Sequence, residues 1–449
     1  MKKQTVIQLL IILILLAILS VLSYKTVNVY KSDNSSAKNT EMKGPGGEMN
    51  GGNNSQSVNA QGAFNVTDSQ SLSGEYTSTN SDESAILVSD GGSLELNNSQ
   101  ITKSGDSSNT ENSEFYGINA GILTTKGSTT TIKNSNIETS SKGSNAVFAT
   151  GTDAKVYISD STITTTGESS ARGLDATYGG YIEADNVTIS TAGGSCAALA
   201  TDRGEGTVIA RNSNLKTAGR GSPIIYSTGD ITLESSKGTA TGSQVCVIEG
   251  KNTATIKNSV ISSSGKGNRN DVDNCGVMIY QSMSGDADEG TGTFNCTDST
   301  LEITSDSTVY KTAPFFFITN TNAVINLENT VLNFGSGILL NAEGTSEWGK
   351  SGSNAGNVVF NAKKQKLLGD IVADSISSVE LNLSESSYFE GKINTDNTAK
   401  EVSLKISSSS KIKLTGDSYV TSLTDEDSTY SNIDFNGYNL YVNGELVNK

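Results

Sequence analysis

The sequence predicts an all-β protein: a single parallel β-helix (a solenoid) of about a dozen coils, preceded by an N-terminal hydrophobic helix and a disordered linker. Two observations predict this fold. A short phrase of alternating apolar and polar residues recurs along most of the chain. Hydrophobic residues make up only 34% of the 449 residues, while Gly, Ser, Thr and Asn are abundant. A thin solenoid meets both conditions, because few positions per coil fill its bore.

Residues 1–31 are predicted to be a signal or membrane anchor. Two lysines precede an apolar run from Val6 to Leu22. The run is near the short limit for a membrane span and longer than the usual signal-peptide core, which favours an uncleaved anchor over cleavage near Ser23. Because short positive segments stay in the cytoplasm, the rest of the chain is expected outside the cell, tethered or secreted.

Residues 32–62 are predicted to be a disordered linker. They are rich in Gly and Asn and hold almost no β-branched apolar residues, so they cannot bury enough surface to become ordered. Residues 63–449 then form the predicted β-helix domain. We expect caps at both of its ends, because end coils expose unpaired strand edges.

The repeated phrase defines the predicted coil, and Val156-x-Ile158-x-Asp160-x-x-Ile163 is a clear copy. Its alternation predicts strands, and the polar residue predicts a bend, because Asn and Asp tolerate the left-handed conformation. Successive copies are mostly 23 or 26 residues apart, as in one coil of a parallel β-helix. The bend residues should stack as a ladder at one corner. They are Asn98, Asn134, Asp160, Asn186, Asn212, Ser235, Asn258, Asp298 and Asn329.

A second ladder supports this register. Four threonines lie two residues beyond the aliphatic residue of the phrase, so by alternation they should point into the bore. There we expect their stacked hydroxyl groups to satisfy one another. The neighbours that point outward are mixed in type, which disfavours an ice-binding face. The inward threonines are Thr139, Thr165, Thr191 and Thr217.

Charge and composition exclude several classes of function. The chain has 32 basic and 48 acidic residues and a net charge of −16, which disfavours nucleic acid as a partner. Histidine is absent, which excludes Ser-His-Asp catalysis and histidine-bound zinc. Any chemistry must therefore use Asp, Glu, Arg, Lys, Tyr or an oxygen-bound cation.

The four cysteines show no C-x-x-C spacing, which disfavours a thiolate metal site. Cys246 and Cys275 are about one coil apart, a separation at which neighbouring coils can form a disulfide. The alternative, which we favour, is that Cys196, Cys246, Cys275 and Cys296 are buried thiols that act as small apolar residues.

Several phrases resemble a known class of proteins. Repeated Asn-Ser-x-Ile-x-Thr phrases, with turns such as Ala149-Thr150-Gly151 and Ser227-Thr228-Gly229, resemble right-handed parallel β-helix surface proteins of bacteria. These proteins share the pectin-lyase-like architecture and are often described as adhesin-like. The resemblance covers roughly residues 75 to 395. It implies that the β-helix is right-handed, but it does not imply the function, because this architecture hosts lyases, hydrolases, adhesins and passive stalks.

Weak candidates for catalysis follow from the same resemblance. Lyases of this architecture abstract a proton with Arg or Lys, while carboxylates hold Ca²⁺ against an acidic sugar. Charged residues on successive predicted coils could imitate that arrangement, although ion pairing on an exposed sheet also explains them and is the favoured interpretation. The candidates are Arg172, Asp175, Asp202, Arg203 and Glu249.

Three inserts lengthen the coils and form the candidate recognition surface, because binding is usually placed on loops. Two inserts are acidic and are weak candidates for Ca²⁺, the one cofactor that the sequence suggests; the favoured alternative is solvated acidic loops. The third holds the single tryptophan, which can stack on a sugar ring or cover a strand end. The metal candidates are Asp271, Asp273, Asp286, Asp288 and Glu289. The binding candidates are Trp348, Tyr280 and Gln281.

Two functions are therefore compared. The favoured one is a non-enzymatic, membrane-tethered extracellular protein, adhesin-like, that binds a glycan or another cell-surface partner. The alternative is a polysaccharide lyase or glycoside hydrolase that acts through Asp, Glu and Arg on the β-helix face. Convergence of Asp175, Asp202 and Glu249 in a cleft with Arg172 or Arg203 would favour the enzyme, and dispersal along a flat face would favour binding.

Overall fold

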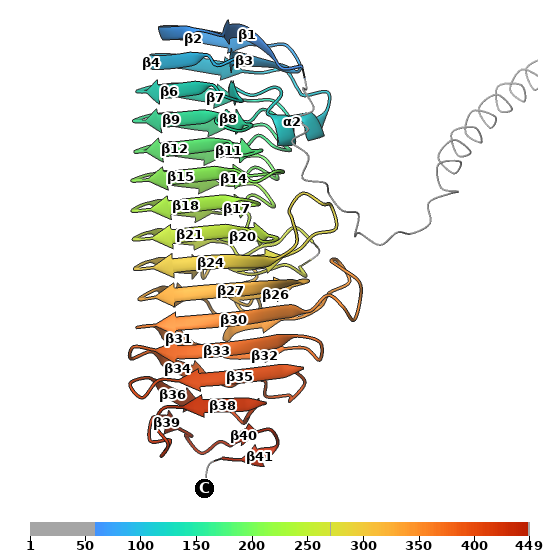
Figure 1. Ribbon diagram of the computed structural model, residues 1–449, viewed down its shortest axis with the longest axis vertical. Helices are drawn as coiled ribbons and strands as arrows, with labels where there is room; N and C mark the ends of the chain where they lie inside the picture. Colours follow the sequence, from blue (N-terminus) through green and yellow to red (C-terminus); the bar gives the residue numbers. More distant parts are fainter. Residues whose placement is uncertain (1–58, 270, 448–449) are drawn as a thin grey trace, which may run out of the picture. The chain divides into compact units, whose positions relative to one another are not determined.

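The computed structural model describes residues 59–269 and 271–447, which form a parallel β-helix (Figure 1). The predicted anchor and most of the predicted linker lie outside these residues. The first strand begins at Gln61, within the last two residues of the predicted linker. No helix among the described residues is long and apolar enough to cross a membrane.

One wall of the β-helix is a twelve-stranded sheet among the described residues, here called sheet A. Each strand pairs in parallel with the strand of the next coil, which confirms the prediction of about a dozen coils. The strands are β1 (Gln61–Val66), β3 (Glu83–Val88), β5 (Ile122–Thr125), β8 (Val147–Thr150), β11 (Leu174–Thr177), β14 (Leu199–Thr201), β17 (Ile225–Ser227), β20 (Cys246–Glu249), β23 (Val277–Tyr280), β26 (Phe316–Thr319), β29 (Ile338–Ala342) and β32 (Asp370–Ala373).

The other walls belong to sheet B, which has 22 strands within the described ranges. In the middle coils it contributes two short strands on either side of a bend. Its strands are β2 (Ser69–Ser78), β4 (Ser93–Lys103), β6 (Thr129–Lys133), β7 (Asn136–Thr139), β9 (Lys155–Ser159), β10 (Thr162–Thr165), β12 (Tyr181–Asp185), β13 (Thr188–Thr191), β15 (Thr207–Arg211), β16 (Asn214–Thr217), β18 (Asp230–Glu234), β19 (Lys237–Ala240), β21 (Thr253–Lys257), β22 (Val260–Ser263), β24 (Thr291–Thr297), β25 (Thr300–Ile303), β27 (Thr321–Glu328), β28 (Val331–Asn333), β30 (Gly356–Lys363), β33 (Ser378–Ser384), β35 (Glu401–Ile406) and β38 (Ser422–Asp425).

Two smaller sheets complete the C-terminal coils. The last two strands form an antiparallel hairpin, which ends the parallel stack. The four-stranded sheet holds β31 (Lys366–Leu368), β34 (Tyr388–Gly391), β36 (Lys411–Leu414) and β39 (Ile433–Asp434). The three-stranded sheet holds β37 (Ser418–Val420), β40 (Leu440–Val442) and β41 (Glu445–Leu446).

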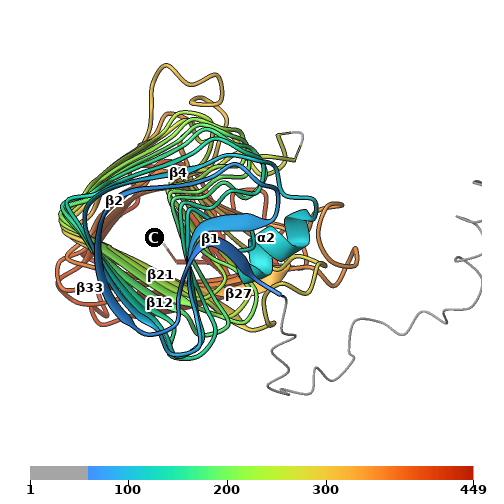
Figure 2. The ribbon, with the colours of Figure 1, turned by 90° about the horizontal axis from the view of Figure 1, so that it is seen from above.

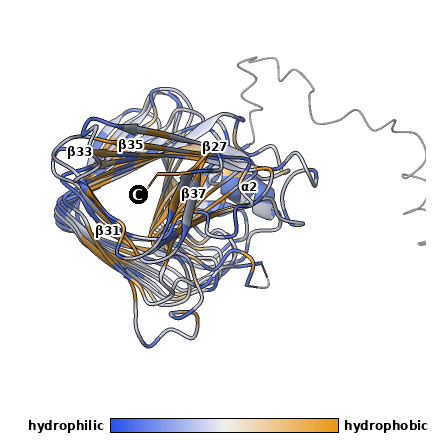
Figure 3. Cartoon of the chain, turned by 90° about the horizontal axis from the view of Figure 1, so that it is seen from below, coloured by the Kyte–Doolittle hydropathy of each residue, from blue (hydrophilic) through white to orange (hydrophobic). Residues whose placement is uncertain are grey.

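The predicted register is confirmed. Val156 pairs with Ile182 and Ile163 pairs with Ile189, each 26 residues further along the chain. The apolar positions of the phrase are buried and belong to one continuous core along the bore. Viewed along the axis, the apolar residues lie on the strands around the bore and the outer loops are mostly hydrophilic (Figure 3). The low apolar content thus reflects a narrow core.

The predicted corner ladder is also confirmed. All nine bend residues have positive φ, from 47° at Asn329 to 53° at Asn186. Neighbouring side chains stack in places, since Asn186 Nδ2 donates to Asp160 Oδ1 over 2.7 Å. The left-handed bend continues at Lys364, where φ is 48°, beyond the last predicted position.

The predicted partners of the inward threonines were wrong. The side chains are buried as expected, but their hydroxyl groups do not bond to one another. Thr139 Oγ1 donates to the carbonyl of Ser144 over 2.7 Å, and Thr191 Oγ1 donates to that of Cys196 over 2.6 Å. Each threonine therefore stabilises the next bend of its own coil. That bend leaves a backbone carbonyl group buried in the bore, and the threonine hydroxyl supplies the hydrogen-bond donor that this group requires.

A buried serine ladder was not predicted. The residue after the corner is usually serine, and its Oγ accepts the backbone N–H of the equivalent residue one coil earlier. Ser213 Oγ accepts from Val187 N over 3.2 Å, and Ser236 Oγ accepts from Ser213 N over 3.0 Å. This ladder satisfies N–H groups at the corner, where the strand hydrogen bonds are interrupted.

Replacing Ser213 by alanine should lower the free energy of unfolding by about 2 kcal/mol, because the buried N–H of Val187 loses its acceptor. Urea denaturation followed by circular dichroism measures the change. Ser190→Ala, which alters a half-buried outward side chain one coil earlier, is the matched control and should change little. Equal stabilities for the two variants would contradict the role given to the serine ladder.

The disulfide alternative is wrong: all four cysteines, in the described part of the chain, are free and buried. Cys246 belongs to the core of the bore, whereas Cys275 packs outside sheet A with Trp348. The sheet separates the two thiols, so one-coil spacing does not bring them together. Burial raises the pKa of the Cys196 thiol to about 11, which keeps it protonated and unreactive.

Candidate functional site

The outer face of sheet A is covered rather than exposed to solvent. The strand register sets one outward column along this face, apolar at both ends and polar in the middle. It contains Leu87, Leu123, Phe148, Asp175, Ala200, Tyr226, Val247, Met278 and Phe317. A second outward column passes through Glu249, Tyr280 and Thr319. Most of the predicted site residues lie on or beside these columns.

A short helix covers the N-terminal end of the face. Helix α2 (Thr110–Tyr116) begins after Asn109, whose side chain accepts the N–H of Asn112, and ends at Gly117 with φ of 68°. The segment that follows packs Ile118 against Leu123 and Phe148 of the face. In the axial view α2 lies outside the coils, beside β1 (Figure 2).

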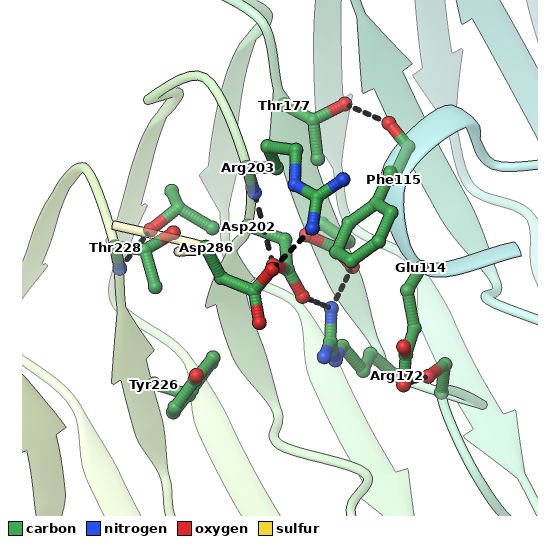
Figure 4. A network of polar contacts seen from close by, with 12 residues as sticks. Glu114, Phe115, Arg172, Thr177, Asp202, Arg203, Tyr226, Thr228 and Asp286 are labelled. Atoms are coloured by element: carbon green, nitrogen blue, oxygen red, sulfur yellow. Dashed lines mark hydrogen bonds and ion pairs between the residues drawn. The ribbon is translucent and has the colours of Figure 1, made fainter. Parts of the chain in front are cut away.

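Arg172 is the centre of a buried network on the polar part of the face. Its Nη1 lies 2.7 Å from Asp175 Oδ2 and 2.7 Å from Asp202 Oδ2. All three residues are at most 6% exposed. Figure 4 shows Arg172 beside Asp202, with Glu114 of α2 close by. The structure thus brings three of the five predicted catalytic candidates together, below the surface.

Arg203 ties the covering segments to one another. Its Nη2 donates to Asp286 Oδ1 over 2.6 Å, and its guanidinium carbon lies 3.8 Å from the centre of the Phe115 ring (Figure 4). Phe115 also accepts a hydrogen bond at its carbonyl from Thr177 Oγ1. Helix α2 and the insert after β23 are therefore joined above Asp202.

Glu249 forms a separate cluster further along the face. Its Oε2 accepts from the hydroxyl groups of Tyr226, over 2.9 Å, and Tyr280, over 2.8 Å. Trp348 packs edge-on against Tyr280 with ring centres 5.4 Å apart and is only 6% exposed. Trp348 therefore covers the sheet and supports Tyr280, the second of the two roles predicted for it, and its ring offers no open stacking surface. Gln281 is also buried, and its Nε2 donates to the carbonyl of Ala287.

Four of the five predicted metal ligands in the acidic inserts use their carboxylates within the protein. Asp273 accepts two backbone N–H groups, and Asp271 accepts from Asn274. Asp286 pairs with Arg203, while Asp288 pairs with Lys251. Glu289 is exposed. Across residues 59–269 and 271–447, no three or more His, Cys, Asp or Glu residues are grouped to hold a metal ion, so the predicted Ca²⁺ ligands are not assembled there.

Some members of the network were not predicted. Glu114 and Phe115 reach it from α2, and Tyr226 connects its two parts, with its ring 5.7 Å from the Arg172 guanidinium. Arg172 bonds both predicted aspartates, and Arg203, the other predicted arginine, pairs with Asp286 instead. The coil spacing could have indicated that Asp175 and Asp202 lie close together. Asp175 is on β11, which pairs with β14, and Asp202 directly follows β14.

Burial dominates the electrostatics of the network. It raises the pKa of Asp175 to about 6 and that of Asp202 to about 7, and the attraction of Arg172 opposes the rise without cancelling it. Two carboxylates share one guanidinium in a region of low polarity, which favours a proton on one of them. The hydroxyl pKa values of Tyr226 and Tyr280 are raised far above 10 by burial and by Glu249, so both remain donors.

The raised pKa values predict a loss of stability with rising pH. Between about pH 4 and 7 the folded state keeps a proton that the unfolded chain has released, so the free energy of unfolding falls as pH rises through this window. Asp202→Asn removes one of the coupled carboxylates. The difference in the free energy of unfolding, variant minus wild type, should therefore increase by about 3 kcal/mol as pH rises from 4.5 to 8.

Urea denaturation at pH 4.5, 6 and 8 measures this gain. Asp153→Asn is the control, because it makes the same charge change at an exposed residue. A difference between Asp202→Asn and wild type that stays constant with pH would rule out the coupled titration.

Comparisons with protein-family models, curated proteins and solved structures found no match to this chain. Strand order and register therefore carry the assignment of its class. The chain is a repeat protein, a parallel β-helix. Its polar network around Arg172 is buried beneath the segments that cover sheet A.

Proposed function

We propose that this protein is a non-enzymatic, membrane-tethered extracellular β-helix, adhesin-like, that binds a glycan or another cell-surface partner. The observation that carries the proposal is the burial of the catalytic candidates. Arg172 bonds both Asp175 and Asp202, and all three side chains are buried, so the two carboxylates are already paired with a cation and are not exposed to a sugar. A general base or acid must reach its substrate. Arg203, beside Asp202, instead holds the covering segments together through Asp286 and Phe115.

The proposal also includes a location outside the cell, tethered to the membrane, and membership of a superfamily. The apolar run of residues 1–31 supports a tether, and the Gly- and Asn-rich residues 32–62 support a stalk. The Asn-Ser-x-Ile-x-Thr phrases support membership of the pectin-lyase-like superfamily. The net charge of −16 argues against nucleic acid as the partner.

Retention of the full chain, purified in detergent, on insoluble polysaccharides and on whole cell envelopes tests the proposal. We expect retention without release of sugars, and the same retention for Asp202→Asn at pH 6, because the network is structural. Passage of the wild-type chain through every glycan and envelope fraction would contradict the proposal.

The alternative is a polysaccharide lyase or glycoside hydrolase, and one observation favours it. Arg172, Asp175 and Asp202 do converge, and Asp175 Oδ1 is buried without a hydrogen-bond partner among the described residues. Perturbed carboxylates of this kind cluster at active sites. Release of reducing or unsaturated products by wild type, abolished in Asp202→Asn, would establish this function instead.

A further inference from the structure

A shallow trough of about 650 Å³ follows the asparagine corner across the first four coils. One side is formed by Glu75, Gln100, Asn136 and Thr162. The other side includes the bend residues Asn98, Asn134 and Asp160. The trough lies on sheet B and takes no residue from the covered face of sheet A. It therefore provides a surface independent of the buried network.

The register makes the trough a repeating surface. Glu75 pairs with Gln100, Gln100 with Asn136, and Asn136 with Thr162, so a polar side chain recurs at the same position once per coil, as a carboxylate, two amides and a hydroxyl. Neighbouring coils are about 4.8 Å apart, so the four coils present polar groups along about 14 Å. A surface with this repeat suits a polymer of repeating units that lies along the axis of the β-helix.

The lining chemistry suits hydroxyl groups. Amide side chains offer both a donor and an acceptor, as a pair of sugar hydroxyls requires. Asn98 and Asn134 are exposed and form no side-chain hydrogen bond with another described residue. Asn136 Nδ2 donates to Gln100 Oε1 over 2.8 Å and to Glu138 Oε1 over 2.6 Å, which orients both amides. Among the described residues, Asn136 Oδ1 and Gln100 Nε2 are left to accept from and donate to a ligand. The lining includes the carboxylates Glu75 and Asp160 but no basic residue, which disfavours an anionic polymer.

An aromatic side chain lies on the coil that ends the trough, outside its lining. Tyr157 lies on β9, three residues before Asp160, and is 39% exposed. Its ring centre is 6.1 Å from that of Tyr181 on the next coil, which supports its position. An exposed tyrosine beside polar groups offers an apolar face for a sugar ring.

From these observations we infer that the trough binds a neutral linear polysaccharide along the axis of the β-helix. The inference rests on the proposed function and names its ligand class and site. The strands hold the lining groups at fixed spacing, so affinity should increase with the number of sugar units until the four coils are spanned.

Calorimetric titration of the full chain in detergent tests the inference. The probes are neutral β-linked glucose and N-acetylglucosamine oligosaccharides of increasing length, with oligogalacturonates as the anionic comparison. We expect binding of at least one neutral series. The double variant Gln100→Ala/Asn136→Ala should weaken it about tenfold through the loss of two or more hydrogen bonds. Asn295→Ala, a half-buried outward asparagine far along the same sheet, is the control and should bind as wild type.

The outcomes separate this inference from the proposed function. Wild-type affinity in the double variant would overturn the trough as the site, while glycan binding itself would stand. Tighter binding of oligogalacturonates would overturn the neutral class, and no binding of either neutral series would overturn the inference as a whole. If the double variant melts below wild type, Tyr157→Ala replaces it, because this change removes a partly exposed ring and leaves the amides of the trough in place.

Discussion

Replacing Arg172 by methionine is expected to lower the free energy of unfolding by about 4 kcal/mol at neutral pH. Arg172 bonds Asp175 and Asp202 below the surface, so the variant leaves two buried carboxylates without a counter-charge. Chemical denaturation at pH 7.5 measures the loss. The double variant Arg172→Met/Asp202→Asn should recover part of it, because one of the uncompensated charges is removed.

Arg211 offers a matched control for this experiment. It also pairs with two carboxylates, those of Glu183 and Glu234, but its side chain is 37% exposed. Water and salt screen such pairs, so Arg211→Met should cost no more than about 1 kcal/mol. Equal losses in the free energy of unfolding for the two methionine variants would contradict the prediction that the buried Arg172 network stabilises the fold more than an exposed ion pair does.

Replacing Gly193 by alanine is expected to cost about 3 kcal/mol, because the new methyl group collides with the coil before it. A Cβ atom at Gly193 would lie 1.9 Å from the carbonyl oxygen of Gly167, and one at Gly219 would lie 1.8 Å from that of Gly193. These contacts involve backbone atoms, which cannot turn aside. The coils must separate locally or the corner must be rebuilt, and thermal unfolding should show a lower midpoint.

The neighbouring Gly194 is the control. A Cβ atom there would meet the carbonyl oxygen of Arg220 at 3.4 Å, an ordinary contact. Gly194→Ala should therefore leave stability within about 0.5 kcal/mol of wild type. A stable Gly193→Ala protein with the midpoint of Gly194→Ala would contradict the close approach of these coils.

The regular part of the fold could be predicted because each coil repeats local rules. Asp160 and its equivalents bend the chain, and Ile163 and its equivalents fill the bore, whatever lies elsewhere in the sequence. The serine of each Asn-Ser-x-Ile phrase was visible too. Its role was not, because that role depends on an N–H group one coil away.

The candidate site was less predictable because it depends on contacts between distant segments. Arg203 meets Asp286 across 83 positions of sequence, and α2 reaches the face from an insert with no repeat. Trp348 was placed on a loop correctly, but only the packing of that loop on Met278 and Phe317 shows that its ring is buried. Alternation along a strand gives the direction of a side chain but not what covers it.

Mass-spectrometric detection of products released from neutral and acidic polysaccharides tests most directly whether the buried network is structural. The full wild-type chain should retain bound glycan and release no product at pH 6 or 8, and Asp202→Asn should behave in the same way. Products formed by wild type and lost in Asp202→Asn, with folding intact, would identify Arg172, Asp175 and Asp202 as an active site and contradict the binding function.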